Sequence, residues 1–512
     1  MNQPNIIFIL IDDMGARDLG CYGSTFYETP NIDTLAAEGM LFTDAYAACP
    51  VCSPTRASIL TGRYPVSVGV TDWIDSQHGI HPAKGSLVDA PYIDHLPPEL
   101  PNLARELSAR GYATWHVGKW HLGDEPYWPE KQGFDVNVGG WTVGAPTHGY
   151  FSPWHFPTLS ESPDGTYLTD RLTDESLDLI RTRDTERPFY LNLWYYSVHT
   201  PIQAKDELIA KYEEKAQRLG LDTQASIVEG AYHPAEHKQH KRIKRRIIQS
   251  DPVYAAMIET LDTNIGRVLA TLDEEGIADN TMVIFTSDNG GLSTAEGTPT
   301  SNLPLAEGKG WMYEGGVREP LLLRWPGRTA AGTTNDTVVT SPDFMPTLLE
   351  AVDASAGGDD ATAAESAAGA GDGDSRLPGG IEGTSILPVL TGEIERLDRG
   401  PVFWHYPHYG NTGGTPGTSV RDGRYKLIEF HEDGHVELFD LEADPGEHHE
   451  LSAELPEVRD RLHRALREWR RSVEARMPEP NPEFSPWPER QPSGRFAVDT
   501  AFGRLSIEDP RV

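Results

Sequence analysis

The sequence is poor in cysteine and has no long hydrophobic run. Three cysteines among 512 residues exclude a fold that depends on a framework of disulfides. No apolar stretch approaches the roughly 20 residues that a membrane-spanning helix needs, so we expect no membrane partner. Residues 1–11 lack the basic start and the small-residue cleavage site of a signal peptide. The expected location is therefore the cytoplasm.

Basic residues are also scarce. They number 44 against 78 acidic residues, which gives a net charge of −34, and only about a quarter of them are lysine. Such a surface stays hydrated in concentrated salt, where self-repulsion is screened, and it indicates a salt-rich cytosol. It argues against nucleic acid as a partner, because phosphate binding depends on patches of Lys and Arg. One basic run, residues 237–246, is expected to be a solvated loop or helix face.

Apolar runs that resemble strands alternate with helical patterns, which predicts an α/β fold with a large, mostly parallel sheet flanked by helices. Because the chain exceeds the size at which a single core stops growing, we expect two domains, residues 1–392 and a smaller C-terminal subdomain over 393–512. A segment rich in Ala, Gly, Asp and Ser, 354–376, is expected to be a disordered insertion. The main strands are expected at 5–11, 112–117, 189–196, 281–286 and 320–325.

The C-terminal subdomain is expected to contain an antiparallel sheet. Residues 419–430 and 435–441 alternate in polarity and turn at Asp-Gly pairs, which is typical of hairpins. A helical pattern follows over about 455–474. The Pro-rich stretch 477–492 is expected to pack in extended form or to be a loose tail.

Acidic and amide side chains follow two of the predicted strands. Asp12 and Asp13 come after the first strand, and Asp288 and Asn289 come after the fourth. In open α/β sheets the ligand crevice lies outside the carboxyl ends of the strands, so these four side chains can converge. On its own, an acidic pair in this place is more often a helix cap or a turn. Four oxygen donors together would suit a hard cation, Ca²⁺ or Mg²⁺, better than zinc.

Cys52 precedes a predicted helix over 55–61, with Ser53 as the N-cap and Gly62 as the end. The helix N-terminus and Arg56 in its first turn would attract an anion. Read without further context, Cys52 is a small buried thiol or a nucleophile activated by the helix dipole. With Cys49 it also forms a C-x-x-C pair, which alone would suggest a redox dithiol or half of a zinc site.

Four further residues are candidates for anion binding or proton transfer. Lys119 and His121 follow the second strand and, being two apart, face the same way in extended backbone. His199 follows the third strand, where a lone histidine would more often be structural. Lys309 lies in the Gly-rich loop 307–318, which could bring backbone close to an anion.

The pattern C-x-P-x-R followed by A-S-I-L-T-G-R-Y-P, from Cys52 onwards, resembles the signature of the type I sulfatases of the alkaline-phosphatase-like superfamily. The resemblance covers about residues 4 to 350 and resumes after the insertion. It implies that a formylglycine-generating enzyme oxidises Cys52 to formylglycine (3-oxoalanine) on the unfolded chain. It also implies a Ca²⁺ ion whose ligands are Asp12, Asp13, Cys52 in its oxidised form, Asp288 and Asn289.

The resemblance further implies a mechanism for a sulfate ester. Hydrated formylglycine attacks sulfur, the substrate alkoxide leaves, and sulfate is expelled when the aldehyde reforms. We assign His199 as the general acid for the leaving group, and His121 as the group that helps remove the proton in the second step. Arg56, Lys119 and Lys309 would hold the sulfate oxygens. Together with a divalent cation they outweigh the charge of the three carboxylates, so this pocket is positive within an acidic molecule.

The sequence says less about the substrate than about the reaction. The aromatic and imidazole tract 403–409 and the Gly-rich stretch 410–417 predict contacts to a sugar, with His405 and His408 as the substrate-binding residues and Trp73, His78 and Trp141 on the same rim. Packing in the core explains these aromatics equally well. We expect a sulfated carbohydrate, from small molecule to oligosaccharide, ahead of an aryl or alkyl sulfate. The alternatives are a phosphonate monoester or phosphodiester hydrolase on the same scaffold, and a glycan-binding protein whose cysteine is never converted. The sequence does not specify an oligomeric state.

Overall fold

A central sheet of nine strands organises the computed structural model, which describes residues 3–76, 78–356 and 377–486. The strand order is β11-β2-β10-β9-β1-β6-β4-β5, and β12 also pairs with β2. β1, β4, β5, β6 and β9 run parallel to one another, whereas β10 is antiparallel to both β2 and β9. The prediction of a mostly parallel α/β sheet is confirmed. The strands are β1 (Asn5–Ile11), β2 (Met40–Tyr46), β4 (Ala113–Gly118), β5 (Val136–Val138), β6 (Phe189–Trp194), β9 (Thr281–Ser287), β10 (Arg318–Arg324), β11 (Thr333–Asn335) and β12 (Val339–Thr340).

β1 shows why the sheet needs helices on both faces. All seven of its residues are buried, because side chains alternate between two hydrophobic cores. Ile7, Ile9 and Ile11 lie in one core. Ile6, Phe8 and Leu10 lie in the other.

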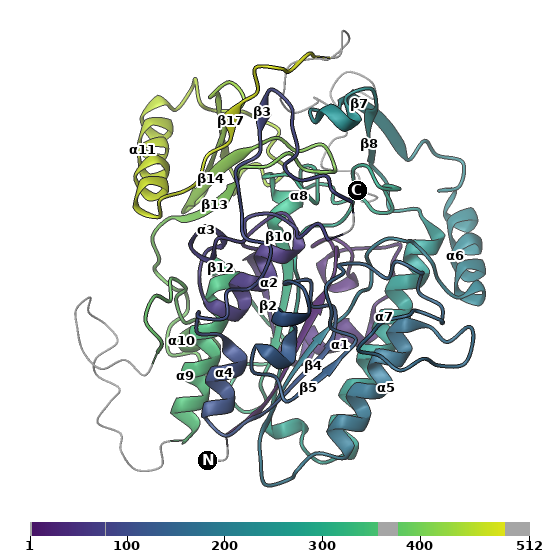
Figure 1. The fold of residues 1–512 in the computed structure, drawn as a ribbon. Coiled ribbons are helices and arrows are strands. Elements are labelled where there is room, and N and C mark those ends of the chain that lie inside the picture. Colours follow the sequence, from purple (N-terminus) through teal and green to yellow (C-terminus); the bar gives the residue numbers. More distant parts are fainter. Residues whose placement is uncertain (1–2, 77, 357–376, 487–512) are drawn as a thin grey trace.

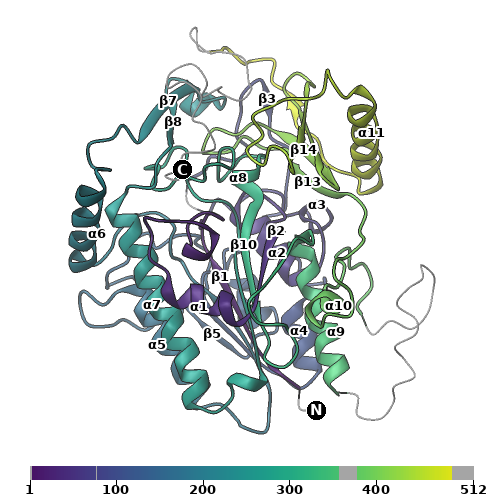
Figure 2. The same ribbon diagram turned by 180° about the vertical axis from the view of Figure 1, so that it is seen from behind.

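The helices form a layer on each side of the sheet, seen at right and left of the sheet in Figure 1 and reversed in Figure 2. One layer shares the core of Ile7 and contains α1 (Pro30–Glu38), α5 (Leu168–Arg181), α6 (Asp206–Leu219) and α7 (Pro252–Glu274). The other layer shares the core of Phe8 and contains α2 (Cys52–Thr61), α3 (Pro65–Val68), α4 (Leu103–Ala109), α9 (Phe344–Ala356) and α10 (Leu387–Leu390). Because the central strands run parallel, their carboxyl ends lie at one edge of the sheet. This edge faces the C-terminal subdomain (Figure 1).

The C-terminal subdomain is a four-stranded antiparallel sheet covered by one long helix, at the upper left of Figure 1. The strands are β13 (Val402–Tyr406), β14 (Gly417–Asp422), β15 (Tyr425–Phe430) and β16 (Val436–Asp440), and the helix is α11 (Pro456–Ser472). The hairpins turn at Gly423 and Gly434, both with positive φ, as the Asp-Gly pairs indicate. The expected antiparallel sheet and helix are present. The domain boundary between residues 392 and 393 stays a prediction.

Smaller elements complete the fold. The Pro-rich stretch begins with β17 (Glu479–Pro480), which pairs with β3 (Leu87–Val88) near the cavity described below. Most of the predicted insertion, 357–376, and the chain beyond 486 lie outside the described residues. Within the described residues no helix combines the length and the apolar character needed to cross a membrane. The remaining elements are β7 (Ile227–Tyr232), β8 (Arg242–Arg246), α8 (Glu314–Val317) and the 3₁₀ turns Gly20–Tyr22, Glu125–Tyr127, Pro129–Lys131, Glu236–Lys238, Ala278–Asn280 and Ser341–Asp343.

Candidate active site

Strand register brings the two predicted acidic segments together. β1 and β9 pair in parallel with Ile11 opposite Ser287, so the next residues, Asp12 and Asp288, leave the sheet side by side. The backbone N–H of Asp13 donates to Asp288 Oδ1 at 3.2 Å. β6 and β4 end beside them, since Leu10 and Gly118 both lie opposite Trp194. The carboxyl ends of four strands thus surround one buried point, as the strand order requires.

Three cations bind the carboxylates at this point. Lys119 Nζ lies 2.7 Å from Asp12 Oδ2, and Lys309 Nζ lies 2.8 Å from Asp13. Arg56 contacts Asp288 Oδ2 through Nε at 2.8 Å and Nη2 at 2.7 Å. Burial is the largest influence on Lys309 and would lower its pKa, but Asp13, Cys52, Glu296 and Asp12 together raise that pKa well above its ordinary value. Lys309 is therefore held charged although it is buried.

Some oxygens in the cluster have no hydrogen-bond donor. Asp12 Oδ1 and Asn289 Oδ1 are both buried and unpartnered, while Asn289 Nδ2 donates to Asp13 Oδ1 at 2.8 Å. Burial raises the pKa of Asp12 well above its usual value, with Lys119 opposing it. Ligand atoms of Asp12, Cys52 and Asp288 all lie within 4.8 Å of one another. Unpartnered buried oxygens on such a donor set fit a hard cation.

Cys52 differs in detail from its predicted setting. The helix α2 begins at Cys52 itself, three residues before the predicted start, and its N-cap is Val51 in place of the predicted Ser53. Ser53 does not cap the helix, because its Oγ accepts the backbone N–H of Ile74 at 3.1 Å. All ten residues of α2 are buried. The predicted end of the helix is present, where Gly62 adopts φ 66°.

The thiol of Cys52 is not activated by its surroundings. Burial raises its pKa to about 11, although Lys119 and Lys309 oppose the shift. A thiolate nucleophile would need the opposite shift. Cys49 and Cys52 are both free cysteines, and among the described residues no cluster of potential metal ligands includes Cys49. The readings of an activated thiol and of a zinc C-x-x-C therefore have no support in the geometry.

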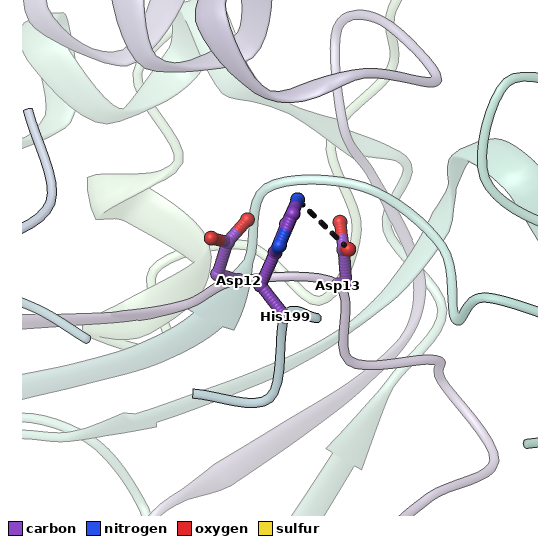
Figure 3. A group of neighbouring side chains, drawn as sticks. All are labelled: Asp12, Asp13 and His199. Atoms are coloured by element: carbon purple, nitrogen blue, oxygen red, sulfur yellow. Dashed lines mark ion pairs between the residues drawn. The ribbon is translucent and has the colours of Figure 1, made fainter. Parts of the chain in front are cut away.

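Two histidines approach the carboxylates from loops. His199 Nε2 lies 3.6 Å from Asp13 Oδ2, the contact drawn in Figure 3, and its Nδ1 lies 2.8 Å from the carbonyl oxygen of Thr200. That carbonyl can only accept, so Nδ1 carries a proton. His121 Nε2 lies 2.9 Å from the carbonyl oxygen of Ile74, while its Nδ1 is buried and unpartnered. Each ring is thus fixed in a single tautomer.

A cavity of about 370 Å³ opens over these groups. Its wall includes Cys52, His121, His199 and Lys309 from the predicted site. Trp73 and His78, predicted on the rim, both line the cavity, as do Asn411 and Thr412 of the predicted Gly-rich stretch 410–417 and Gly310 of the loop that carries Lys309. The lining residues that the sequence did not predict come from other segments: Val51, Ile74, Ser76, Ile80, Val143, Gly144, Ala145, Thr147, Thr200, Pro201 and Glu296.

The two predicted substrate-binding histidines do not line the cavity. His405 is buried, and its ring nitrogens lie 2.8 Å from Thr418 Oγ1 and 2.9 Å from the carbonyl oxygen of Arg476. His408 is fully buried, with Nε2 at 2.9 Å from Thr71 Oγ1. Trp141 is likewise absent from the lining and packs against the main core. These positions correct the expected substrate contacts, because β13 directs its imidazoles into packing between the domains.

The basic run also has a structural explanation. Residues 242–246 form β8, and Arg245 Nε lies 2.6 Å from Glu307 Oε2 at the start of the loop that carries Lys309. Arg246 pairs with Asp251 at 3.3 Å. Part of the basic run therefore forms ion pairs within the protein, so the run is not the fully solvated face that was expected.

Two family models match consecutive parts of the chain. The model described as Sulfatase matches residues 4–354, and the model described as N-sulphoglucosamine sulphohydrolase, C-terminal, matches residues 372–472. The first match covers more than half of the chain and includes every residue of the cluster described above.

Similar full-length proteins have the same classification. The chain is 32% identical to N-acetylgalactosamine-6-sulfatase of Rattus norvegicus, over 80% of this chain and 69% of the relative. It is 30% identical to a sulfatase of Formosa agariphila, over 91% and 88% of the two chains, and 31% identical to arylsulfatase A of Homo sapiens, over 88% and 83%.

A solved structure agrees in fold over nearly the whole chain. The crystal structure of Ps i-CgsB in complex with k-i-k-neocarrahexaose superimposes with a TM-score of 0.71 at 25% identity, over 95% of this chain and 96% of the other. The matched family model, the relatives and the fold all agree, and the chain therefore belongs to the sulfatase family and is a sulfuric ester hydrolase.

Proposed function

We propose that this sulfatase uses a formylglycine made from Cys52 and a bound Ca²⁺ to release sulfate from a sulfated carbohydrate. One observation carries the proposal. Cys52 starts a wholly buried helix beside Asp12 and Asp288, and three buried cations surround it. An ordinary thiol enzyme has no use for a thiol whose pKa is about 11.

The chain's oxygen donors would hold the metal. Asp12, Asp13, Asp288, Asn289 and the oxidised residue 52 supply a set of hard ligands, two of whose oxygens are buried without a donor. When bound, Ca²⁺ would offset the charge of the carboxylates and favour ionisation of a hydroxyl on residue 52. In the protein alone the three cations only balance the three carboxylates. The two positive charges of a bound Ca²⁺ would make the pocket positive overall, so that it attracts an anion.

The cations would hold the sulfate group. Lys119 and Lys309 each have one ammonium that contacts a carboxylate and keeps further N–H groups free to donate. Arg56 is fixed more firmly, because its Nη1 also donates to the carbonyl oxygen of Lys119 at 3.0 Å. These donors need no reorganisation as negative charge develops on the sulfate oxygens, which is how such groups lower a barrier.

The tautomers of the two histidines match the two proton transfers. In His199, Nδ1–H is engaged by Thr200, so Nε2 is the atom that can exchange a proton with the leaving oxygen. Burial, with Lys309 adding to it, lowers the pKa of His199 to about 3 in the site without substrate, and a bound sulfate anion would act against this shift. In His121, Nε2–H is engaged by Ile74, and the unpartnered Nδ1 is free to accept a proton from residue 52. His199 serves as the acid once bound substrate favours a proton on Nε2 as well as on Nδ1, and His121 serves as the base.

A carbohydrate sulfate is the proposed substrate class. The cavity combines the apolar faces of Trp73, Ile74 and Val143 with the polar groups of Glu296 and Asn411, a mixture that suits a sugar. The relatives include an N-acetylgalactosamine-6-sulfatase, and the similar solved structure is a complex with a neocarrahexaose. The sugar and the position of its sulfate ester are to be found by screening.

Two measurements test the proposal. Mass spectrometry of the peptide that contains residue 52 should show the aldehyde in place of the thiol. Matured protein should release sulfate from sulfated saccharides, lose turnover with a calcium chelator, and regain it more fully with Ca²⁺ than with Mg²⁺. Cys52→Ala should fold normally and release no sulfate.

Other results would overturn parts of this assignment. Substantial turnover by Cys52→Ala would exclude residue 52 as the nucleophile. Faster hydrolysis of a nitrophenyl phosphonate than of the matched sulfate would favour the phosphonate hydrolase alternative. An unmodified thiol in the active, isolated protein would exclude formylglycine.

A further inference from the structure

A second buried cluster of carboxylates and imidazoles lies behind the cavity wall. Asp72, His81 and Asp89 belong to the segment between α3 and α4, and His408 follows β13 in the C-terminal subdomain. None of these residues belongs to the site of Cys52, and no step of the sulfatase reaction uses them. Asp72 and His408 are fully buried, and the side chains of His81 and Asp89 are 9% and 1% exposed.

The inner atoms of the four side chains face one another. His81 Nδ1 lies 3.2 Å from Asp72 Oδ2 and 3.8 Å from Asp89 Oδ2. His408 Nδ1 lies 3.7 Å from the same oxygen of each aspartate. Ligands placed about 2.0–2.1 Å from a tetrahedral ion are on the order of 3.3 Å apart. The contact of 3.2 Å matches this spacing, and the three contacts of 3.7–3.8 Å need only a small contraction to reach it.

The same inner atoms lack hydrogen bonds. Asp72 Oδ2, His81 Nδ1 and His408 Nδ1 are buried and unpartnered, and so is the outer His81 Nε2. Asp89 Oδ2 accepts the backbone N–H of Ala83, at 3.1 Å, and also faces the two imidazoles. Buried polar atoms that converge without donating or accepting indicate a missing common partner.

The outer atoms, in contrast, are held in place. Asp72 Oδ1 accepts Tyr406 O–H at 3.0 Å and the backbone N–H of Trp73 at 2.8 Å. Asp89 Oδ1 accepts the backbone N–H of Tyr409 at 2.9 Å, and His408 Nε2 is bound to a threonine hydroxyl. Outer hydrogen bonds of this kind orient the ligands of metal ions in proteins.

The chemistry of the donors selects the ion. Two imidazole nitrogens with two carboxylate oxygens suit Zn²⁺, whereas Ca²⁺ and Mg²⁺ prefer oxygen alone. The rings of Trp73, Tyr92 and Tyr406 pack edge-on against the two imidazoles and keep water away. A divalent ion would also balance the charge of the two buried carboxylates.

We propose that Asp72, His81, Asp89 and His408 form a structural site for a divalent transition metal, Zn²⁺ by preference. The ion fastens the segment between α3 and α4 to the C-terminal subdomain. Trp73, Ile74 and His78 on that segment line the cavity, and the carbonyl oxygen of Ile74 orients His121. The site therefore fixes the wall of the active site and takes no part in the chemical step.

Cobalt substitution tests the proposal independently of catalysis. The full-length Cys52→Ala variant removes the buried thiol beside the calcium ligands, and excess Ca²⁺ occupies those oxygen ligands. After treatment with a chelator, one equivalent of Co²⁺ should produce the intense visible bands of four-coordinate cobalt, and Zn²⁺ should abolish them. Protein purified without chelator should contain about one equivalent of zinc per chain, by elemental analysis.

Matched variants assign the ligands. His408→Gln and Asp72→Asn should each lose the cobalt bands. His405→Gln is the control, because that histidine lies three residues before His408, on β13, and both of its ring nitrogens already have partners. Folding of each variant is checked by its circular dichroism. Absence of tightly bound transition metal from the parent protein, weak six-coordinate bands, or intense bands that persist in folded His408→Gln would each overturn the proposal.

Discussion

Arg56 is a fully buried guanidinium that binds two partners with different hydrogens. It contacts Asp288 twice and the carbonyl oxygen of Lys119 once, so it fixes the ends of β9 and β4 relative to α2. The guanidinium carbon of Arg56 lies 5.3 Å from the centroid of the Trp194 ring. The planar guanidinium reaches Asp288 with Nε and the carbonyl oxygen of Lys119 with Nη1, two nitrogens that a lysine ammonium does not have.

Substitution of Arg56 should expose the coupling between this residue and the metal. Arg56→Met leaves the buried Asp288 without its cation, which we expect to lower the free energy of unfolding by about 3–5 kcal/mol in chelator. Calcium at the same carboxylate should reduce that loss. Denaturant unfolding with and without Ca²⁺ measures both values, and Arg63→Lys at the other end of α2 is the control. Equal losses under the two conditions would contradict a metal ion at Asp288.

Asp18 should contribute a distinct pH dependence to stability. Burial raises its pKa to about 6, against hydrogen bonds from Thr300, Tyr254, Gly15 and Gln249. The unfolded carboxyl titrates near 3.8, so between about pH 4 and 6 the folded state holds a proton that the unfolded state has lost. Stability then falls as pH rises through this window, by up to about 3 kcal/mol, and stays constant above it.

The measurement is a comparison with Asp18→Asn, which has no carboxyl to titrate. Free energies of unfolding from denaturant curves at several pH values give the difference between the two proteins. The wild-type protein should lose stability relative to the variant as the pH rises from 4 to 6. A difference that does not change with pH would refute the assignment.

At the scale of elements, strand ends carry the site and glycines allow them to approach one another. Gly118 ends β4 with φ 107°, and a Cβ there would lie 2.0 Å from the carbonyl oxygen of Trp194 on β6. The next residue, Lys119, donates its backbone N–H to that same oxygen at 2.7 Å. The position of the Lys119 ammonium therefore depends on a close backbone contact that only glycine permits.

Gly118→Ala should reduce both stability and turnover, because the backbone must shift where Lys119 begins. Gly111→Ala provides the matched control, since Gly111 has φ 89° with open space around it. The control should cost about 1–3 kcal/mol for the backbone conformation alone, with turnover retained. Unfolding curves and sulfate release distinguish the variants. Equal effects on turnover would show that the contact to Trp194 does not position Lys119.

The strand ends were also the part of the site that sequence patterns could predict. Asp12, Asp288, Lys119 and His199 follow buried apolar runs, and parallel pairing forces the ends of such runs to one edge. The cap of α2 was predicted wrongly, because Ser53 bonds a distant backbone N–H in place of its own helix. The cavity wall was mostly missed, since loops carry no hydrophobic period. His408 was misplaced for the same reason: only the packing of two domains decides which way it points.

At the scale of the whole molecule, charge is distributed unevenly. The chain carries a net charge of −34, yet Arg56, Lys119 and Lys309 are concentrated in one buried site. The acidic surface repels itself, and that repulsion falls as salt screens it. The suggested salt-rich cytosol stays a prediction that this charge motivates.

We expect the melting temperature to rise as KCl is increased from low ionic strength to molar concentration. Screening lowers the repulsion in the folded state more than in the expanded unfolded chain. Calorimetry in KCl, with saturating Ca²⁺ throughout, measures this effect without changes in metal occupancy. A melting temperature that stays level or falls would show that self-repulsion does not limit stability.

The pairing of β17 with β3 joins one of the last described segments of the chain to the segment between α3 and α4, whose Trp73, Ile74 and His78 line the cavity. Asn481 extends this contact, because its Nδ2 donates to the carbonyl oxygen of Gly85 at 2.9 Å and to Glu236 at 3.0 Å. During synthesis, residue 88 leaves the ribosome almost four hundred residues before its strand partner does. This contact can therefore form only after nearly the whole chain has been made. If Cys52 is converted as proposed, an oxidising enzyme could reach its segment throughout that interval.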